Sequence, residues 1–212
     1  MDQPKALATP VLLHVAQQIS VPLKSLVSTI ALLDEGATVP FIARYRKEVT
    51  GNLDEVQIRD IQEKLEYFRE LEDRRETVLH SIGEQGKLTP ELRAKIEAVL
   101  EKNELEDLYL PYKPKRRTKA SIAREKGLEP LADYLWNQQD TGVALADLAA
   151  GFVSQELGVA SAAEALEGAR HVVAERVSEE AGFRKAVRQM MVEEGRVSSR
   201  AIEGVEDPEK KY

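Results

Sequence analysis

The sequence predicts an all-α, multihelical fold, with a helix-turn-helix-like unit at the N-terminus followed by a long helical hairpin. Three observations lead to this prediction. Apolar residues recur at three- and four-residue spacing through most of the 212 residues. Strand-like segments are few, and no internal repeat is visible. Helix starts such as Thr89-Pro90, together with punctuating glycines, divide the chain into pieces of helical length.

Three short helices are expected in the first fifty residues. The first covers about residues 10–19. The second is expected to be capped by Ser20 and to end at Gly36, and the third is expected to be capped by Thr38. Two short helices joined by a glycine turn resemble a helix-turn-helix, although such pairs are more common as packing units. The third helix carries three cations of the kind that a groove-reading helix uses: Arg44, Arg46 and Lys47.

The longest helical pattern runs over about residues 55–82, and either Asn52 or Asp54 can cap it. Glu72 and Arg75 fall on its apolar seam, which argues against a long dimeric coiled coil. We therefore expect this helix to pack against a partner within the chain.

The expected partner is a helix from Thr89 to Asn103 that returns antiparallel along the long one. A further short helix leads to residues 111–119, here called the basic strap. Prolines hold the strap extended, and no acidic residue between Asp107 and Glu125 neutralises its five cations. Its candidate binding residues are Tyr112, Lys113, Lys115, Arg116, Arg117 and Lys119.

Further helices are expected after the strap. The first covers about residues 118–126, the second begins at Pro130, and the third lies around Leu148. A fourth follows a capping box formed by Ser161 and Glu164, and the last one ends at Gly195. The expected subdivisions are a helix-turn-helix-like part (1–52), a hairpin (53–110), the strap with further helices (111–195) and a linker (196–212).

Composition limits the classes of function. Hydrophobic residues make up 42% and charged residues 32% of the chain, which is typical of a soluble protein with a highly charged surface. The net charge of −7 argues against bulk attraction to nucleic acid or anionic lipid, so a polyanion site must be local. With no cysteine, the sequence has no disulfides or thiolate zinc sites, and a cytoplasmic location is expected. The uncharged stretch from Ala6 to Leu23 is interrupted by Pro10 and Pro22, which predicts short helices and neither a membrane span nor a signal peptide.

Motifs for catalysis are absent from the sequence. The three histidines are isolated, with no partner at metal-binding spacing, and no Gly-rich phosphate loop or nucleophile elbow is present. Acidic pairs stand where helices show charge to solvent rather than in apolar surroundings that would separate their pKa values. We expect no enzyme, no metal and no cofactor.

Several long segments carry a resemblance to a known family. They are 36–51 with the following Leu53-Asp54-Glu55, 106–119, 123–132, and Gly168-Ala169-Arg170 followed by Ala174-Glu175-Arg176. Through them the sequence resembles, in order and over nearly its whole length, the N-terminal region of the bacterial Tex family of transcription accessory proteins. The segment 36–51 resembles the N-terminal signature of this family, and its central part crowds aromatic and basic groups into a few residues: Val39-Pro40-Phe41-Ile42-Ala43-Arg44-Tyr45-Arg46-Lys47-Glu48.

The resemblance implies a helical region that precedes an inactive ribonuclease-H-like domain, helix-hairpin-helix elements and an RNA-binding OB-fold in the full-length proteins. It also implies RNA or DNA as a partner, bound without sequence preference, and RNA polymerase or associated transcription factors as possible partners. Residues 196–212 would then lead toward the ribonuclease-H-like domain.

Two hypotheses remain open from the sequence. In the first, the cations of the third helix and of the strap form an auxiliary phosphate-contacting surface, because Arg and Lys contacts to phosphates position a nucleic acid without reading it. In the second, the chain is an interaction scaffold that docks on the transcription machinery or on later domains of the same protein.

Overall fold

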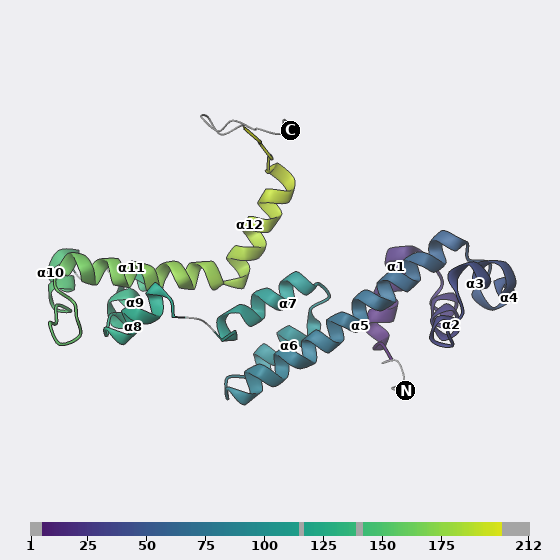
Figure 1. The fold of residues 1–212 in the computed structure, drawn as a ribbon, viewed down its shortest axis with the longest axis horizontal. Helices are drawn as coiled ribbons and strands as arrows, with labels where there is room; N and C mark the ends of the chain where they lie inside the picture. The colour runs from purple at the N-terminus through teal and green to yellow at the C-terminus, as the bar shows by residue number, and fades with distance from the viewer. Residues whose placement is uncertain (1–5, 115–116, 139–141, 201–212) are drawn as a thin grey trace, which may run out of the picture. The chain divides into compact units, whose positions relative to one another are not determined.

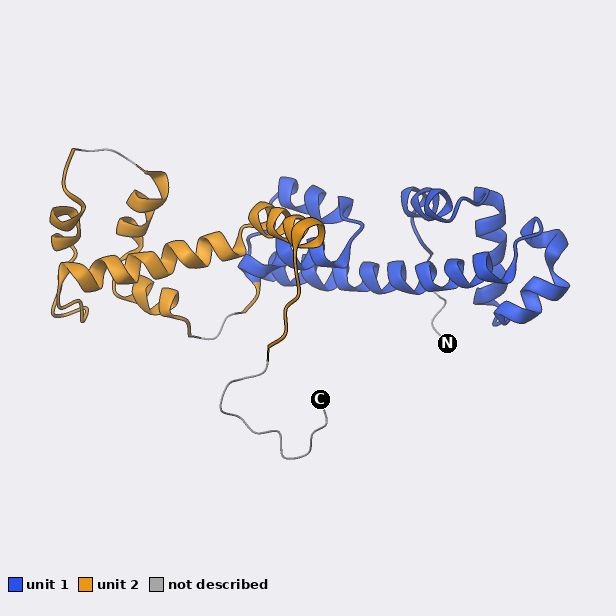
Figure 2. Cartoon of the chain, turned by 90° about the horizontal axis from the view of Figure 1, so that it is seen from above, with its two compact units in different colours: residues 1–112 blue, residues 113–212 orange. Residues whose placement is uncertain are grey.

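The computed structural model of the chain describes residues 6–114, 117–138 and 142–200. These residues form twelve α-helices and one 3₁₀ turn, and they contain no strand beyond an isolated antiparallel bridge between Ser154 and Val159. The all-α prediction is therefore confirmed. The chain divides into two compact units, Met1–Tyr112 and Lys113–Tyr212, shown in blue and orange in Figure 2. The finer division expected from the sequence stays a prediction.

Unit 1 is built on the long helix α5, with α1, α2 and α3 against its N-terminal part and α6 and α7 against its C-terminal part (Figure 1). Its elements are α1 (Thr9–Ile19), α2 (Leu23–Asp34), α3 (Val39–Tyr45), α4 (Lys47–Thr50), α5 (Glu55–Glu84), α6 (Pro90–Ala98), α7 (Lys102–Tyr109) and the 3₁₀ turn η1 (Leu110–Tyr112). One apolar cluster, drawn from most of these helices, forms the core of the unit.

The start of α5 is fixed by a capping box. The Asp54 carboxylate accepts a hydrogen bond from the Gln57 backbone N–H (2.8 Å), and the Gln57 side chain accepts one from the Asp54 N–H (3.1 Å). Two of the N–H groups that a helix start leaves unpaired are thereby satisfied. From this start, fully buried apolar side chains follow at helical spacing, among them Ile58, Ile61 and Ile82.

Arg75 explains why the helix after Thr89 is shorter than expected. Its guanidinium is buried on the seam of α5, where it donates hydrogen bonds to the Glu72 carboxylate and to the Val99 carbonyl. Val99 is extended (ψ 133°), so α6 ends at Ala98. The predicted end at Asn103 is therefore wrong, because the chain turns to bring a carbonyl to a buried cation.

The predicted cap at Ser20 is also wrong. Ser20 has left-handed backbone angles (φ 57°, ψ 45°), and its N–H bonds back to the carbonyls of the last turn of α1. Since it closes α1, it cannot cap α2, whose N-cap position is taken by Pro22. Thr38 does occupy the N-cap position of α3, but its side chain makes no capping hydrogen bond.

Unit 2 is built on α11, along which α8, α9 and α10 pack (Figure 1). Its elements are α8 (Lys119–Glu125), α9 (Glu129–Asn137), α10 (Leu145–Ala150), α11 (Ala162–Glu179) and α12 (Ala181–Glu194). Small residues line the inner face of α11, and Leu128, Leu131 and Val172 lie at the centre of the apolar cluster with no exposed surface or almost none.

Half of the predicted capping box is found at the start of α11. The Ser161 hydroxyl accepts a hydrogen bond from the Glu164 N–H (3.2 Å), as expected. The Glu164 carboxylate accepts instead from the Ala160 N–H (2.9 Å) and from the Lys126 ammonium (2.7 Å). The glutamate thus links α11 to the residue after α8.

Helix α12 differs from the other long helices because none of its residues is buried. The Glu180 carboxylate caps it by accepting a hydrogen bond from the Phe183 N–H (2.8 Å). Its larger apolar side chains are each about half exposed or more: Phe183, Val187, Met190, Met191 and Val192. Within the described ranges, no helix has both the length and the apolar character that crossing a membrane requires.

Candidate nucleic-acid interface

The α3 segment presents a cluster of aromatic and basic side chains at its surface. Pro40 lies in the first turn, where its missing N–H costs little, and α3 ends at Tyr45. The prediction that this helix carries three cations is therefore wrong for Arg46 and Lys47, because Arg46 leaves the helical conformation (φ −131°, ψ 27°) and Lys47 begins α4. On the inner side Ile42 has no exposed surface and anchors the helix to the core of unit 1. Because residues three and four apart share one face of a helix, Phe41, Arg44 and Tyr45 lie on the opposite side.

The two aromatic rings lie together on this outer side. Phe41 is 40% exposed and Tyr45 61% exposed, and their ring centroids are 5.4 Å apart with the planes tilted by 45°. The guanidinium carbon of Arg46 lies 5.0 Å from the centroid of the Phe41 ring, a cation–π contact. Arg46 also donates a hydrogen bond to the Tyr45 carbonyl (3.0 Å). Phe41, Tyr45 and Arg46 therefore contact one another.

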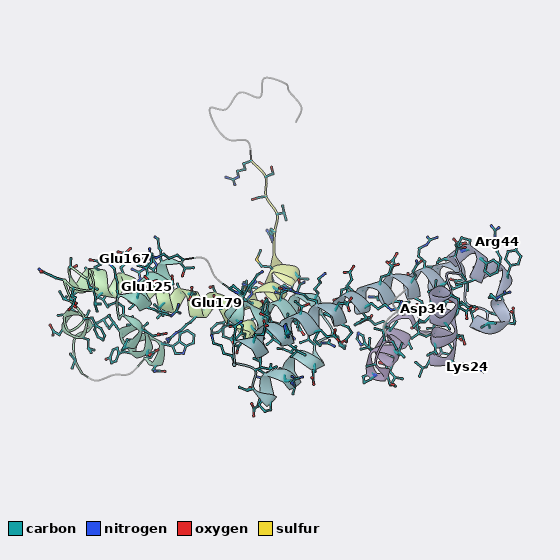
Figure 3. The ribbon with its side chains drawn as sticks, turned by 60° about the horizontal axis from the view of Figure 1, so that its bottom comes forward. Lys24, Asp34, Arg44, Glu125, Glu167 and Glu179 are labelled. Atoms are coloured by element: carbon teal, nitrogen blue, oxygen red, sulfur yellow. The ribbon has the colours of Figure 1, made fainter. Side chains whose placement is uncertain are left out.

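Two further cations complete the cluster, here called the α3 cluster: Phe41, Arg44, Tyr45, Arg46 and Lys47. Arg44 and Lys47 are exposed, and Figure 3 shows Arg44 projecting from the end of unit 1. Glu48 is the adjacent acid, also exposed. Among the described residues, neither Arg44 nor Lys47 has an ion-pair partner. Their charges therefore face solvent.

The beginning of the basic strap is partly used for packing. Pro111 and Tyr112 lie in the 3₁₀ turn η1, so the prediction of an extended strap is wrong at these first residues. Tyr112 is half-buried against the core of unit 1, and the Gln85 side-chain amide donates to its carbonyl (2.8 Å). Tyr109, just before it, is buried, with its hydroxyl 3.1 Å from that of Ser81. These tyrosines therefore support the core, whereas Lys113 beside them is exposed.

The rest of the strap leads into α8. Arg117 forms an ion pair with Glu125 (3.0 Å), and both side chains are mostly exposed. Thr118 caps α8 through Ser121 and donates to the Glu175 carboxylate (3.1 Å). Lys119, the first residue of α8, is exposed. The two remaining candidates, Lys115 and Arg116, lie outside the described residues.

The candidate residues of unit 1 do not form one surface. The α3 cluster lies by the N-terminal part of α5, whereas Tyr112 is bonded to Gln85 at the C-terminal end. A 30-residue helix is about 45 Å long, so the two positions are far apart. Tyr112 therefore lies apart from the α3 cluster.

Phe41 and Tyr45 were not among the candidate binding residues named from the sequence. From the sequence alone, these rings can be either exposed or packed in the core. The sequence does contain one indication of their exposure. At helical spacing Phe41 and Tyr45 share a face with the charged Arg44, and the apolar Val39 and Ile42 lie on the other face. In the part of the chain that the structure describes, no group of His, Asp and Glu side chains is arranged to hold a metal ion.

Comparison with protein families gives two matches. Residues 9–83 match the Tex-like protein N-terminal domain, and residues 140–212 match the Tex central region-like family. The first range contains the whole α3 cluster.

Individual relatives agree with these matches. The chain is 49% identical to the transcriptional accessory protein Tex of Neisseria gonorrhoeae, over 93% of this chain and 26% of that protein. It is 50% identical to protein YhgF of Escherichia coli, over 87% of this chain and 24% of that protein. It is 30% identical to the S1 RNA-binding domain-containing protein 1 of Pongo abelii, over 77% of this chain and 16% of that protein. The chain thus spans about a quarter of the length of its bacterial relatives.

Proposed function

Because the chain belongs to the Tex family and corresponds to the N-terminal part of bacterial Tex proteins, we propose that it is a non-catalytic helical module of a transcription accessory protein that contacts nucleic acid. The contact is auxiliary and made to phosphates, through Arg44, Arg46 and Lys47 of the α3 cluster. The exposed lysines of the strap, Lys113 and Lys119, are proposed as a separate phosphate contact. The partner is RNA or DNA bound without sequence preference.

The observation that carries this proposal is the state of the α3 cations. Arg44 and Lys47 are exposed and have no ion-pair partner among the described residues, in a chain whose net charge is −7. Arg117 of the strap differs from them, because it forms an ion pair with Glu125. A local group of unpaired cations beside exposed aromatic rings is typical of a phosphate-contacting surface.

The printed names of relatives support the same class of partner. One relative is a transcriptional accessory protein, and a more distant one carries an S1 RNA-binding domain in its name. Those names describe proteins about four to six times longer than the matched part. The proposal for this chain therefore depends on the α3 cluster.

Fluorescence anisotropy of the whole chain with single-stranded RNA and with duplex DNA tests the proposal. With about three phosphate contacts, the affinity should fall roughly 20- to 40-fold between about 50 and 200 mM salt. The double variant Arg44→Ala/Lys47→Ala should bind weakly and show a flatter salt dependence. A matched control, Lys87→Ala/Lys95→Ala, removes the same charge from exposed positions of unit 1 and should behave like the parent.

Absence of binding at low salt, or equal effects of the two double variants, would contradict the proposal. A further variant, Lys113→Ala/Lys119→Ala, measures what the strap contributes, since both lysines are exposed.

A second candidate function is an interaction scaffold, which α12 favours. This helix exposes Phe183, Val187 and Met190 at helical spacing, and the described part of unit 2 covers none of them completely. In this function the helix docks on RNA polymerase or on later domains of a longer protein. Binding of purified polymerase, lost in Phe183→Ser/Met190→Ser but kept in Arg44→Ala/Lys47→Ala, would favour the scaffold.

A further inference from the structure

The feature that points beyond phosphate contact is the ring of Tyr45. It is the most exposed aromatic side chain among the described residues, with 61% of its surface accessible. The buried contacts of α3 come from Ile42 and Val39, and Tyr45 is not among them. The ring is instead available to a ligand.

The ring already packs against a neighbouring side chain before any ligand binds. Tyr45 lies against Phe41, and the Phe41 ring is in turn contacted by the Arg46 guanidinium. The Tyr45 carbonyl accepts a hydrogen bond from the same guanidinium. On the inner side, Ile42 holds the helix against the core. A ring that is already ordered loses little conformational freedom on binding, which favours its use as a contact surface.

Cations stand on both sides of Tyr45 in the chain. Arg44 precedes it, Lys47 follows two residues later, and both are exposed. Glu48, the exposed acid next to Lys47, limits the positive charge at one edge. An aromatic platform between cations is the arrangement that binds the base and the backbone of a single strand together.

Building on the function proposed above, we propose that the α3 cluster binds single-stranded nucleic acid, with one base stacked on the Tyr45 ring and adjacent phosphates on Arg44 and Lys47. In a duplex the faces of the bases are covered by neighbouring bases, and only their edges are accessible in the grooves. A tyrosine ring can stack only where a base is unpaired. Because every base has such a face, the contact tolerates any sequence.

Three ligands of equal length, about 12 nucleotides, test this inference with the whole chain. They are a single strand, an abasic single strand with the same number of phosphates, and a duplex. The single strand should bind about 5- to 150-fold more tightly than the abasic strand, which corresponds to one stacked base. The single strand should also bind more tightly than the duplex.

Variants at Tyr45 locate the effect. Tyr45→Leu should abolish the preference for the strand with bases, whereas Tyr45→Phe should retain it. Phe183→Leu is the matched control, since Phe183 is a half-exposed aromatic residue of α12, and it should leave the preference unchanged. Circular dichroism checks that each variant remains helical.

The outcomes separate the inference from the proposed function. Equal affinity for the abasic and normal strands would overturn stacking and leave phosphate contact in place. Tighter binding of the duplex would also overturn it, in favour of a groove-reading helix. No binding of any of the three at low salt would overturn both. The ligand comparison needs no variant, so a Tyr45 substitution that unfolds the chain would not prevent the test.

Discussion

Gly168 shows how one missing side chain decides a helix contact. It lies within α11, where a Cβ atom would be 2.3 Å from Leu128 Cδ1 and 3.4 Å from the Ala123 Cβ. Leu128 is almost fully buried, so making room for the added methyl group disturbs packed core contacts. Gly168→Ala should therefore destabilise unit 2 by about 1–3 kcal/mol in urea unfolding, as other overpacked cores do.

The matched control for this substitution is Gly83→Ala in α5, where the nearest atom would be Leu88 Cδ2 at 4.0 Å. There the higher helix propensity of alanine should keep or raise stability by up to about 1 kcal/mol. Equal effects of the two substitutions would show that the contact with Leu128 does not limit the packing of α11.

At the same scale, Glu164 should make stability depend on pH. The hydrogen bond from Lys126 is the largest cause of a lowered pKa for this carboxyl, followed by the one from the Ala160 N–H. Because the folded pKa lies below the unfolded one, the stabilisation is complete above the ordinary carboxyl pKa of about 4.3 and is lost as the pH falls through the lower, folded value.

Urea unfolding at neutral pH and at several acidic values checks this expectation. Glu164→Gln should lower the stability at neutral pH and reduce its loss in acid. An unchanged acid dependence would mean that other carboxyl groups account for it.

Some features of single residues can be predicted from the sequence and others cannot. The caps formed by Asp54 and Thr118 depend on local chemistry, and the sequence indicates a helix start at both positions. The burial of Arg75 depends on a carbonyl 24 residues away, and no local pattern shows it. The exposure of Tyr45 follows from the phase of α3, which is fixed only by the packing of Ile42.

Helices α11 and α12 are adjacent but should differ in what they contribute to stability. Val172 of α11 has no exposed surface, and removing its two methyl groups in Val172→Ala should cost about 2 kcal/mol. Val187 of α12 is 53% exposed, so Val187→Ala should change stability by less than about 0.5 kcal/mol. Thermal and urea unfolding of the two variants compare them directly. A large loss in Val187→Ala would mean that α12 packs more closely than the structure indicates.

Helix positions were more predictable than helix ends. Apolar spacing located most helices, α5 and α11 among them, because each has a face that must be buried. Two kinds of helix end differ from the prediction. Helix α6 ends at Ala98 because the next carbonyl accepts a hydrogen bond from the distant Arg75, and α1 is closed by the left-handed conformation of Ser20. Neither cause can be recognised from the helix propensities of the residues near the end.

On the scale of the whole molecule, each unit has its own apolar core. The buried residues of the first cluster all lie before residue 113, and those of the second all lie after it. Residues 1–112 alone should therefore fold as a helical domain with a cooperative urea transition, visible by circular dichroism. A fragment without a cooperative transition would show that the second unit is needed for the first to fold.

For the candidate site, the sequence indicates which residues are cations, but their exposure and partners depend on the folded structure. The sequence identified the cations of the α3 cluster and of the strap from composition. It could not separate the exposed Arg44 from the paired Arg117, because the partner of Arg117 depends on how the chain folds back. Nor could it show that Tyr112 packs on the core while Tyr45 faces solvent.

The proposed contact between nucleic acid and the α3 cluster can be located residue by residue. Backbone amide chemical shifts are recorded while a single-stranded oligonucleotide is titrated into the isotopically labelled chain at low salt. The largest shifts are expected at residues 41–48, smaller ones at the exposed strap lysines, and none along α12. Shifts confined to α12, or saturable binding without change at residues 41–48, would contradict it.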